Sequence, residues 1–227
     1  MEAKNMKEIS RHKRVNDILL GPLERPALHW LAAHMPAWVT PDICTAIGIG
    51  GAFITLMGYI LSNVSPVFLW LASLGFLINW FGDSLDGTLA RYRHIERPLY
   101  GYFLDHTTDS ITQVMIFCGL GLSPYVSFNV ACMALVGYLI MCIVTYLRTS
   151  VSGEFRISYG RLGPTESRVV AVLLNMLMYF LGVQTHTFNG LTFNTYDLPV
   201  LAVAVILFGF FFNTAWQEAR RLAAQGE

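Results

Sequence analysis

Two runs of sequence decide the fold of this chain: Asp83-Ser84-Leu85-Asp86-Gly87-Thr88-Leu89-Ala90-Arg91 and Gly101-Tyr102-Phe103-Leu104-Asp105-His106-Thr107-Thr108-Asp109. They place four aspartates in or beside segments that are otherwise apolar. Carboxylates at membrane depth are energetically costly, and where they occur they commonly mark a functional site. The two runs therefore indicate where two membrane-spanning helices meet an interface and where the chemistry of the protein takes place.

The composition is typical of an integral membrane protein. Of the 227 residues, 54% are hydrophobic and 13% are charged, whereas soluble domains carry about 25% charged residues. The formal net charge is zero, and the chain offers no basic face of the size that nucleic-acid binding requires. No nucleic-acid partner is expected. The four cysteines lie in apolar runs without CxxC spacing and are interpreted as packing residues; they are Cys44, Cys118, Cys132 and Cys142.

Six apolar stretches are each near the roughly 20 residues that a helix needs to cross hydrocarbon. They cover residues 43–61, 66–82, 102–122, 130–147, 169–183 and 198–216. Ahead of them, residues 26–35 carry apolar side chains at helical spacing, flanked by Trp30 and Trp38, and predict a short amphipathic helix at the bilayer surface. The expected fold is all-α and integral to the membrane, with six transmembrane helices behind an N-terminal interfacial helix. We divide it into a cytoplasmic tail with that helix (1–39) and a catalytic transmembrane domain (40–227).

Two features of the first span predict its structure in more detail. Thr40 followed by Pro41 is a helix start, with a hydroxyl cap and proline in the first turn. Small residues recur along one face of the span and predict close contact with another helix. They are Gly48, Gly51, Thr55 and Gly58.

The basic residues determine the expected orientation. In a six-span arrangement all 15 Lys and Arg residues fall on one side, in the two tails and in the second-to-third and fourth-to-fifth connections. The three opposite loops, 62–65, 123–129 and 184–197, contain none. By the positive-inside rule, both termini and the aspartates face the cytoplasm of a multi-pass protein.

The spacing of the aspartates predicts a metal site. Asp83 and Asp86 are three residues apart and Asp105 and Asp109 four apart, so each pair shares a helix face, and a short turn brings the two faces together. Four carboxylates in one small volume either have raised pKa values or are balanced by cations. Two divalent ions would balance them, and an all-oxygen donor set favours Mg²⁺, Mn²⁺ or Ca²⁺ over zinc. Paired metals suit displacement at phosphorus.

A different class of function also uses carboxylates inside membranes. An ion- or proton-coupled transporter would hold them near the bilayer midplane on broken helices. Here they lie towards one membrane edge, and the Gly-x2-Ala-Arg sequence has no role in transport.

The pattern Asp-x2-Asp-Gly-x2-Ala-Arg, followed by Gly-x3-Asp-x3-Asp, resembles the signature of the CDP-alcohol phosphotransferase (phosphatidyltransferase) family. Its internal gap is nine residues here and commonly eight, and the extra residue falls in the turn near Pro98. The run from Leu104 to Ser110, with His106 after Asp105, resembles the choline/ethanolamine phosphotransferase branch. The resemblance implies an enzyme of EC 2.7.8 type in phospholipid biosynthesis, in which an alcohol attacks the β-phosphorus of a CDP-alcohol and CMP leaves.

The resemblance also implies roles for individual residues. Asp83, Asp86 and Asp105 would hold two divalent cations, Mg²⁺ or Mn²⁺, and Asp109 would bind metal and act as general base. Four residues of the motif would border the CDP moiety: Gly87, Ala90, Arg91 and Gly101. The opening Thr40-Pro41-Asp42-x2-Thr45 resembles a segment that helps to form the nucleotide pocket, with Asp42 in place of the family's asparagine. His106 is expected to be a neighbour of the site rather than a ligand.

For three arginines and one glutamate, the sequence allows two roles each. Three arginines at helix ends, Arg148, Arg161 and Arg168, would receive a phosphorylated acceptor or an anionic head group, or would serve as topology anchors. Glu166 would begin the fifth helix, near its positive dipole end, or face an amino-alcohol cation. Two types of donor remain open. The first is CDP-diacylglycerol, with a small polar alcohol as acceptor, and the second is CDP-choline or CDP-ethanolamine, with a diglyceride as acceptor. A homodimer is expected from the resemblance.

Overall fold

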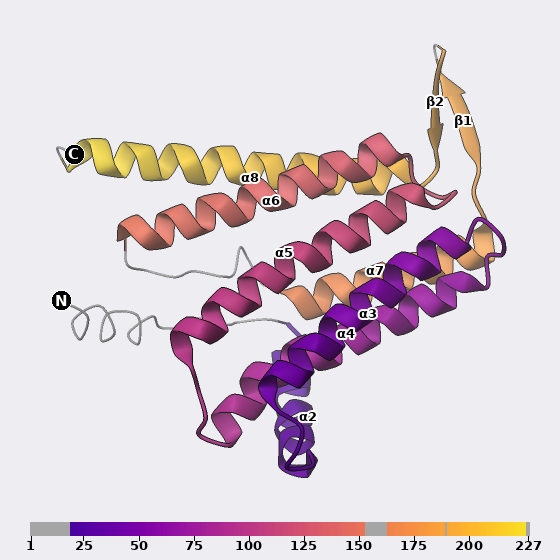
Figure 1. Cartoon of the computed structure of the whole chain (residues 1–227). Helices are drawn as coiled ribbons and strands as arrows, with labels where there is room; N and C mark the ends of the chain where they lie inside the picture. Colours follow the sequence, from indigo (N-terminus) through magenta and orange to yellow (C-terminus); the bar gives the residue numbers. More distant parts are fainter. Residues whose placement is uncertain (1–18, 153–162, 189, 226–227) are drawn as a thin grey trace.

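Helices make up most of the computed structural model, which describes residues 19–152, 163–188 and 190–225 (Figure 1). The helices are α2 (Gly21–His34), α3 (Pro41–Leu61), α4 (Phe68–Tyr92), α5 (Pro98–Leu122), α6 (Phe128–Ser152), α7 (Pro164–Leu181) and α8 (Asp197–Ala224), and the strands are β1 (Thr185–Phe188) and β2 (Leu191–Asn194). Each of the six predicted apolar stretches forms the greater part of one helix, α3 to α8. The short helix predicted before them is α2, which begins five residues earlier than expected.

Membrane crossing is supported for four of the six helices. Among the described residues, α3, α4, α6 and α8 are long and apolar enough to cross a membrane, so the protein is a multi-pass helical membrane protein. The prediction of six spans also includes α5 and α7, which do not meet the same criteria of length and apolarity. Helix α5 carries Asp105 and Asp109 near its start, and α7 is 18 residues long and contains Glu166 and Arg168, and these polar residues lower the hydropathy of both helices.

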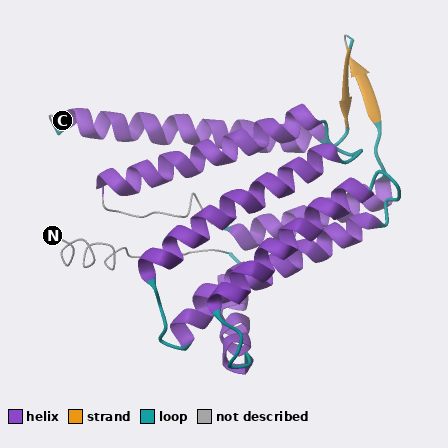
Figure 2. Cartoon of the chain, viewed as in Figure 1, coloured by secondary structure: helices purple, strands orange, loops and turns teal. Residues whose placement is uncertain are grey.

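The prediction of an all-α fold needs one correction. Strands β1 and β2 form an antiparallel hairpin within the loop predicted at residues 184–197, as Figure 2 shows. Gly190 occupies the turn with a φ of +78°, a conformation that glycine adopts without strain. The carboxylate of Asp197 holds the base of the hairpin by accepting hydrogen bonds from the backbone N–H groups of Asn194 and Ser127.

The helices pack in the order α8, α6, α5, α3, α4 and α7, so α5 and α3 occupy the centre. Helix α2 contacts α4 and lies across its C-terminal half (Figure 1). The α4–α5 connection and the C-terminal end of α8 lie at one end of the bundle, and the hairpin lies at the other (Figure 1). This arrangement brings the C-terminal end of α4 and the N-terminal end of α5, which carry the aspartates, to the same end.

The small-residue stripe of α3 packs against α4, as predicted. A Cβ atom added to Gly51 would lie 2.3 Å from the backbone nitrogen of Asn79, and one added to Gly58 would lie 2.4 Å from that of Ala72. Facing them, a Cβ atom on Gly82 would lie 2.3 Å from the nitrogen of Gly48. The two backbones therefore approach more closely than any side chain allows, which sets the distance between α3 and the aspartate-bearing end of α4.

The apolar side of α2 is directed at the protein. Leu28 and Ala32 are buried against Leu85 and Leu89 of α4. Trp30 is 61% exposed and projects from another face of the helix. Thr40 caps α3 as predicted, because its hydroxyl oxygen accepts a hydrogen bond from the N–H of Ile43.

Candidate metal and nucleotide site

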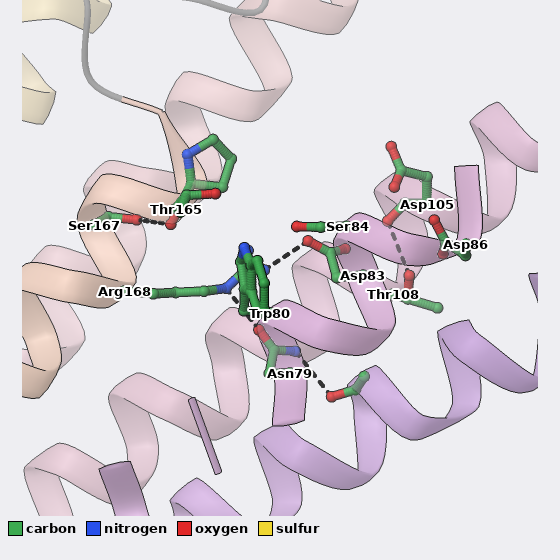
Figure 3. Close-up of polar contacts among 12 residues, drawn as sticks. Asn79, Trp80, Asp83, Ser84, Asp86, Asp105, Thr108, Thr165, Ser167 and Arg168 are labelled. Atoms are coloured by element: carbon green, nitrogen blue, oxygen red, sulfur yellow. Dashed lines mark hydrogen bonds and ion pairs between the residues drawn. The ribbon is translucent and has the colours of Figure 1, made fainter. Parts of the chain in front are cut away.

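Helix α4 continues ten residues past Gly82, so its aspartates share one helical face. Asp83 is directed at Arg168 of α7, and Asp86 lies on the side of α4 where Asp105 of α5 is drawn (Figure 3). The carboxylate of Asp109 interacts electrostatically with those of Asp83, Asp86 and Asp105. The four predicted carboxylates therefore lie in one region, although the last follows the first by 26 positions in the sequence.

A buried arginine on α7 holds the first of these aspartates. Arg168 donates from Nη2 to Oδ2 of Asp83 over 2.6 Å and from Nε to Oδ1 of Asn79 over 2.9 Å. The side chains of Arg168 and Asp83 are only 11% and 21% exposed. Asn79 in turn donates to the carbonyl oxygen of Gly48 on α3. One guanidinium group thus ties α7 to two successive turns of α4, and through Asn79 to α3 (Figure 3).

The second aspartate of α4 is held from α3. The hydroxyl of Thr45 donates to Oδ2 of Asp86 over 2.7 Å, and the backbone N–H of Gly87 donates to Oδ1. Thr45 was predicted to border the nucleotide, and here its hydroxyl orients a predicted metal ligand. A small cavity between α3, α4 and α5 adjoins these groups; it is lined by Thr45, Gly48, Ile49, Asn79, Asp83, Thr108 and Thr112.

A third group of ligating atoms lies on α5. One ligand atom each from Asp105, His106 and Asp109 lies within 4.8 Å of the others. The His106 ring stacks on Tyr146 of α6, with ring centroids 5.0 Å apart, and meets Tyr102 edge-on at 4.2 Å. His106 is predicted to be a neighbour of the site, and its ring lies against Asp105, with Nδ1 3.4 Å from a carboxylate oxygen.

The donor set fits hard divalent cations. The carboxylates supply oxygen atoms, which Mg²⁺ and Mn²⁺ prefer, and neighbouring side chains orient two of them, as in metal sites generally. Asp83 engages a positive group, Arg168, at one carboxylate oxygen, Oδ2. The residues that would hold such ions are the four aspartates.

Motif residues predicted to border CDP lie beside this region on α4 and α5. A Cβ atom on Gly87 would lie 3.3 Å from Nη1 of Arg91, whereas one on Gly101 would meet nothing within 4 Å. Arg91 is exposed and donates to the hydroxyl of Thr88, and Ala90 lies one turn after Asp86. The binding role of these residues stays a prediction.

Asp42 has a partner that the sequence did not indicate. Its carboxylate forms an ion pair with Arg97 in the α4–α5 connection, at 2.5 Å, and both side chains are about half exposed. The hydrogen bond that Arg97 donates to Asp42 raises the pKa of the Arg97 guanidinium above its ordinary value. Arg97 also lies over the ring of Tyr100, 4.0 Å from its centroid. This pair links the start of α3 to the connection that precedes α5.

The residues predicted to bind the acceptor or head group lie on different elements of the fold. Arg148 on α6 pairs with Glu218 on α8 at 3.3 Å. Glu166 is buried and accepts hydrogen bonds from the backbone N–H groups of Leu20 and Gly163, contacts that fit its predicted place at the start of a helix. Arg161 lies outside the described residues.

Sequence reasoning missed two polar groups that position the site. Asn79 lies one turn before Asp83 within an apolar run, a spacing that would have indicated a place on the same face. Glu24 of α2 accepts hydrogen bonds from Trp80 and Ser84 of α4 and from Thr165 of α7. No sequence signal points to Glu24, because its partners lie on two other helices, α4 and α7, that are distant in the sequence.

A family model described as CDP-alcohol phosphatidyltransferase matches residues 38–215 of the chain. Cholinephosphotransferase 1 of Mus musculus is 27% identical over 86% of this chain and 48% of its own length. Archaetidylinositol phosphate synthase of Pyrococcus horikoshii is 24% identical over 81% of this chain and 86% of its own length. The chain spans about half the length of the cholinephosphotransferases it matches.

A solved structure shares the fold. The phosphatidylinositol phosphate synthase of Mycobacterium tuberculosis, crystallised with CDP-DAG bound, superposes with a TM-score of 0.56 at 21% identity. The match covers 84% of this chain and 92% of that one. At this identity the likeness shows a common fold.

Proposed function

Because the chain belongs to the CDP-alcohol phosphatidyltransferase family, we propose that it transfers a phospho-alcohol group from a CDP-alcohol to a second alcohol and releases CMP. The observation that carries this proposal is that the aspartate pairs of α4 and α5, helices consecutive in the chain, lie close enough for Asp109 to experience the charges of the other three carboxylates. The family signature is complete at these positions.

In the proposed reaction Asp109 accepts the proton of the acceptor hydroxyl. The acceptor oxygen forms a bond to the β-phosphorus of the donor, and the bond from that phosphorus to the oxygen bridging to the α-phosphorus breaks. CMP leaves with the electron pair of the broken bond, and the product is a phosphodiester. Divalent cations bound by the aspartates would neutralise charge on the transferring and leaving oxygens.

The chain's own residues orient these groups. Thr45 fixes Asp86 and Arg168 fixes Asp83 through the contacts described above. Gly87 and Gly101 lack side chains where the donor would approach the backbone, and open space beside Gly101 supports this role. Arg91, exposed beside Gly87, would contact the diphosphate.

We also propose that all six helices α3 to α8 cross the membrane, with the aspartates at the cytoplasmic side. Helix α5 has 25 residues and packs between α3 and α6, and at about 1.5 Å per residue it is long enough to cross hydrocarbon. The described basic residues between α4 and α5, and those at the end of α8, lie at one end of the bundle (Figure 1), which the positive-inside rule assigns to the cytoplasm.

For the donor we propose a CDP-amino-alcohol, with CDP-diacylglycerol as the alternative. The run Asp105-His106 and the cholinephosphotransferase relatives support the first, and the crystallised neighbour with CDP-DAG supports the second. A homodimer is proposed from family membership.

The direct test incubates purified protein with Mn²⁺ or Mg²⁺ and pairs of CDP-donors and alcohols, and measures CMP release. We expect release with one class of donor and loss of that release on addition of a chelator. The pairs should include CDP-choline and CDP-ethanolamine with diacylglycerol, and CDP-diacylglycerol with small polar alcohols. Absence of CMP from every pair would refute the proposed function.

A further inference from the structure

Arg168 stands out because it brings a full positive charge into a cluster of carboxylates. Its guanidinium lies 2.6 Å from Oδ2 of Asp83, and it also interacts electrostatically with Asp109. The carboxylate of Asp83 is thus both a proposed metal ligand and the ion-pair partner of Arg168. Arg168 is predicted from the sequence to bind the acceptor or to anchor the topology, and neither role accounts for its ion pair with Asp83.

Burial keeps the charge of Arg168 effective. Its Nη1 atom is buried and has no hydrogen-bond partner among the described residues, so surrounding water screens this guanidinium little. Asn79, which accepts from Nε, is neutral and leaves the positive charge in place. The guanidinium therefore acts on the aspartates as a fixed counter-charge.

We propose that Arg168 is a built-in competitor of the divalent cations, which lowers the affinity of the aspartate site for metal and keeps the carboxylates compatible with one another. This inference rests on the proposed function, since it assumes that the aspartates bind metal. A cation at Asp83 either displaces Nη2 from Oδ2 or binds the other carboxylate oxygen beside a positive group. In both cases Arg168 opposes its binding by Coulomb repulsion.

The effect of Arg168 on metal affinity is opposite to that of a neutral residue that supports a metal ligand. A hydroxyl such as that of Thr45 orients its carboxylate without opposing a cation, and loss of such support weakens metal binding. Loss of Arg168 should strengthen it. The sign of the change therefore distinguishes a counter-charge from a residue that only positions Asp83.

The experiment measures binding of Mn²⁺ alone to detergent-solubilised protein, after treatment with a chelator, from the electron paramagnetic resonance signal of free Mn²⁺. For Arg168→Gln we expect an affinity about tenfold or more above that of the native protein, because a unit charge near the ion is removed. We expect Arg168→Lys, which keeps the charge, to stay within about threefold of the native affinity. The melting temperature of the chelator-treated Arg168→Gln protein should fall, because Asp83 is left buried without its partner.

Asn175→Ala is the matched control. Asn175 is a second polar tie of α7, accepting from Tyr59 and donating to Ser73, and it lies two turns away from Arg168. Its loss should lower the melting temperature without changing Mn²⁺ affinity. If Arg168→Gln does not yield folded protein, Arg168→Met replaces the charge with an apolar side chain that needs no buried partner, and the same tighter binding is expected.

Unchanged or weaker Mn²⁺ binding in the charge-removing variants would overturn the inference while leaving the proposed function intact. Native protein that binds no Mn²⁺ would instead overturn the metal-dependent function, and this inference with it. Tighter binding in Arg168→Gln, with native-like affinity in Asn175→Ala and Arg168→Lys, supports the counter-charge role.

Discussion

Thr45 on α3 donates a hydrogen bond of 2.7 Å to the carboxylate of Asp86 on α4. The contact joins a residue near the start of the first long helix to the second aspartate of the signature, 41 positions later. It depends on the close packing of α3 and α4, because a wider separation would leave the hydroxyl out of reach. The glycines along the α3–α4 contact are therefore part of the architecture of the site.

Thr45→Val removes this hydroxyl and keeps the shape of the side chain. We expect Mn²⁺ affinity and CMP release to fall by about tenfold or more, because Asp86 loses the group that orients it. Metal titrations of CMP release measure the effect. Thr55→Val, on the same helix, removes a buried hydroxyl that donates to the carbonyls of Gly51 and Ala72, and it should leave metal dependence unchanged. Native metal affinity in Thr45→Val would contradict the orienting role.

Asp109→Asn keeps the size of the side chain and removes the base. We expect CMP release to fall by at least about a hundredfold, because the acceptor hydroxyl loses its proton acceptor, while the melting temperature stays near the native value. Steady-state CMP release and thermal unfolding are measured on the same preparations.

Asp197→Asn is the control for that variant. Asp197 accepts hydrogen bonds from Ser127 and Asn194 at the hairpin end of the bundle, far from the aspartate site. The Asp197→Asn substitution should lower thermal stability and leave turnover per folded molecule unchanged. Near-native turnover in Asp109→Asn would exclude the assignment of Asp109 as general base.

Gly58→Ala tests the packing of α3 on α4. The added methyl would lie 2.4 Å from the backbone nitrogen of Ala72, so the helices must move apart, at a cost of about 1–3 kcal/mol in the free energy of unfolding. Gly50→Ala on the same helix meets nothing within 4 Å and should be neutral or stabilising, by up to about 1 kcal/mol. Chemical or thermal unfolding in detergent compares the two. Equal stability of both variants would show that α3 and α4 do not depend on backbone contact.

Glu24→Ala tests the attachment of α2. Three donors, from Trp80, Ser84 and Thr165, lose a shared acceptor, and we expect a loss of stability of about 1–3 kcal/mol for each donor left unsatisfied. Fluorescence of Trp80 should change with the variant. Glu96→Ala, in the exposed α4–α5 connection, is the control and should alter stability by less than about 0.5 kcal/mol. Unchanged stability in Glu24→Ala would mean that water replaces the carboxylate.

Much of this protein could be predicted from sequence because its main signals are local. The apolar runs, the cap at Thr40 and the three- and four-residue spacing of the aspartates each depend on a few neighbouring residues and on helix geometry. They located six helices and the four carboxylates. The limits of α4 and α5 were underestimated, because hydropathy marks only the apolar part of a helix, and these helices continue through the polar residues of the site.

What the sequence by itself determined is the class of protein, the order of its helices and the identity of the aspartates. Tertiary structure alone decided their partners: Arg168 for Asp83, Thr45 for Asp86, and Glu24 as the link between α2, α4 and α7. The same holds for the base of the hairpin at residues 185–194, where Asp197 accepts a hydrogen bond from Ser127, 70 positions away, and Tyr196 donates one to the carbonyl of Gly182. The physical reason is that the periodicity of side chains along one helix depends only on neighbouring residues. A hydrogen bond between two helices depends instead on how closely, and at what depth in the bundle, their backbones pack.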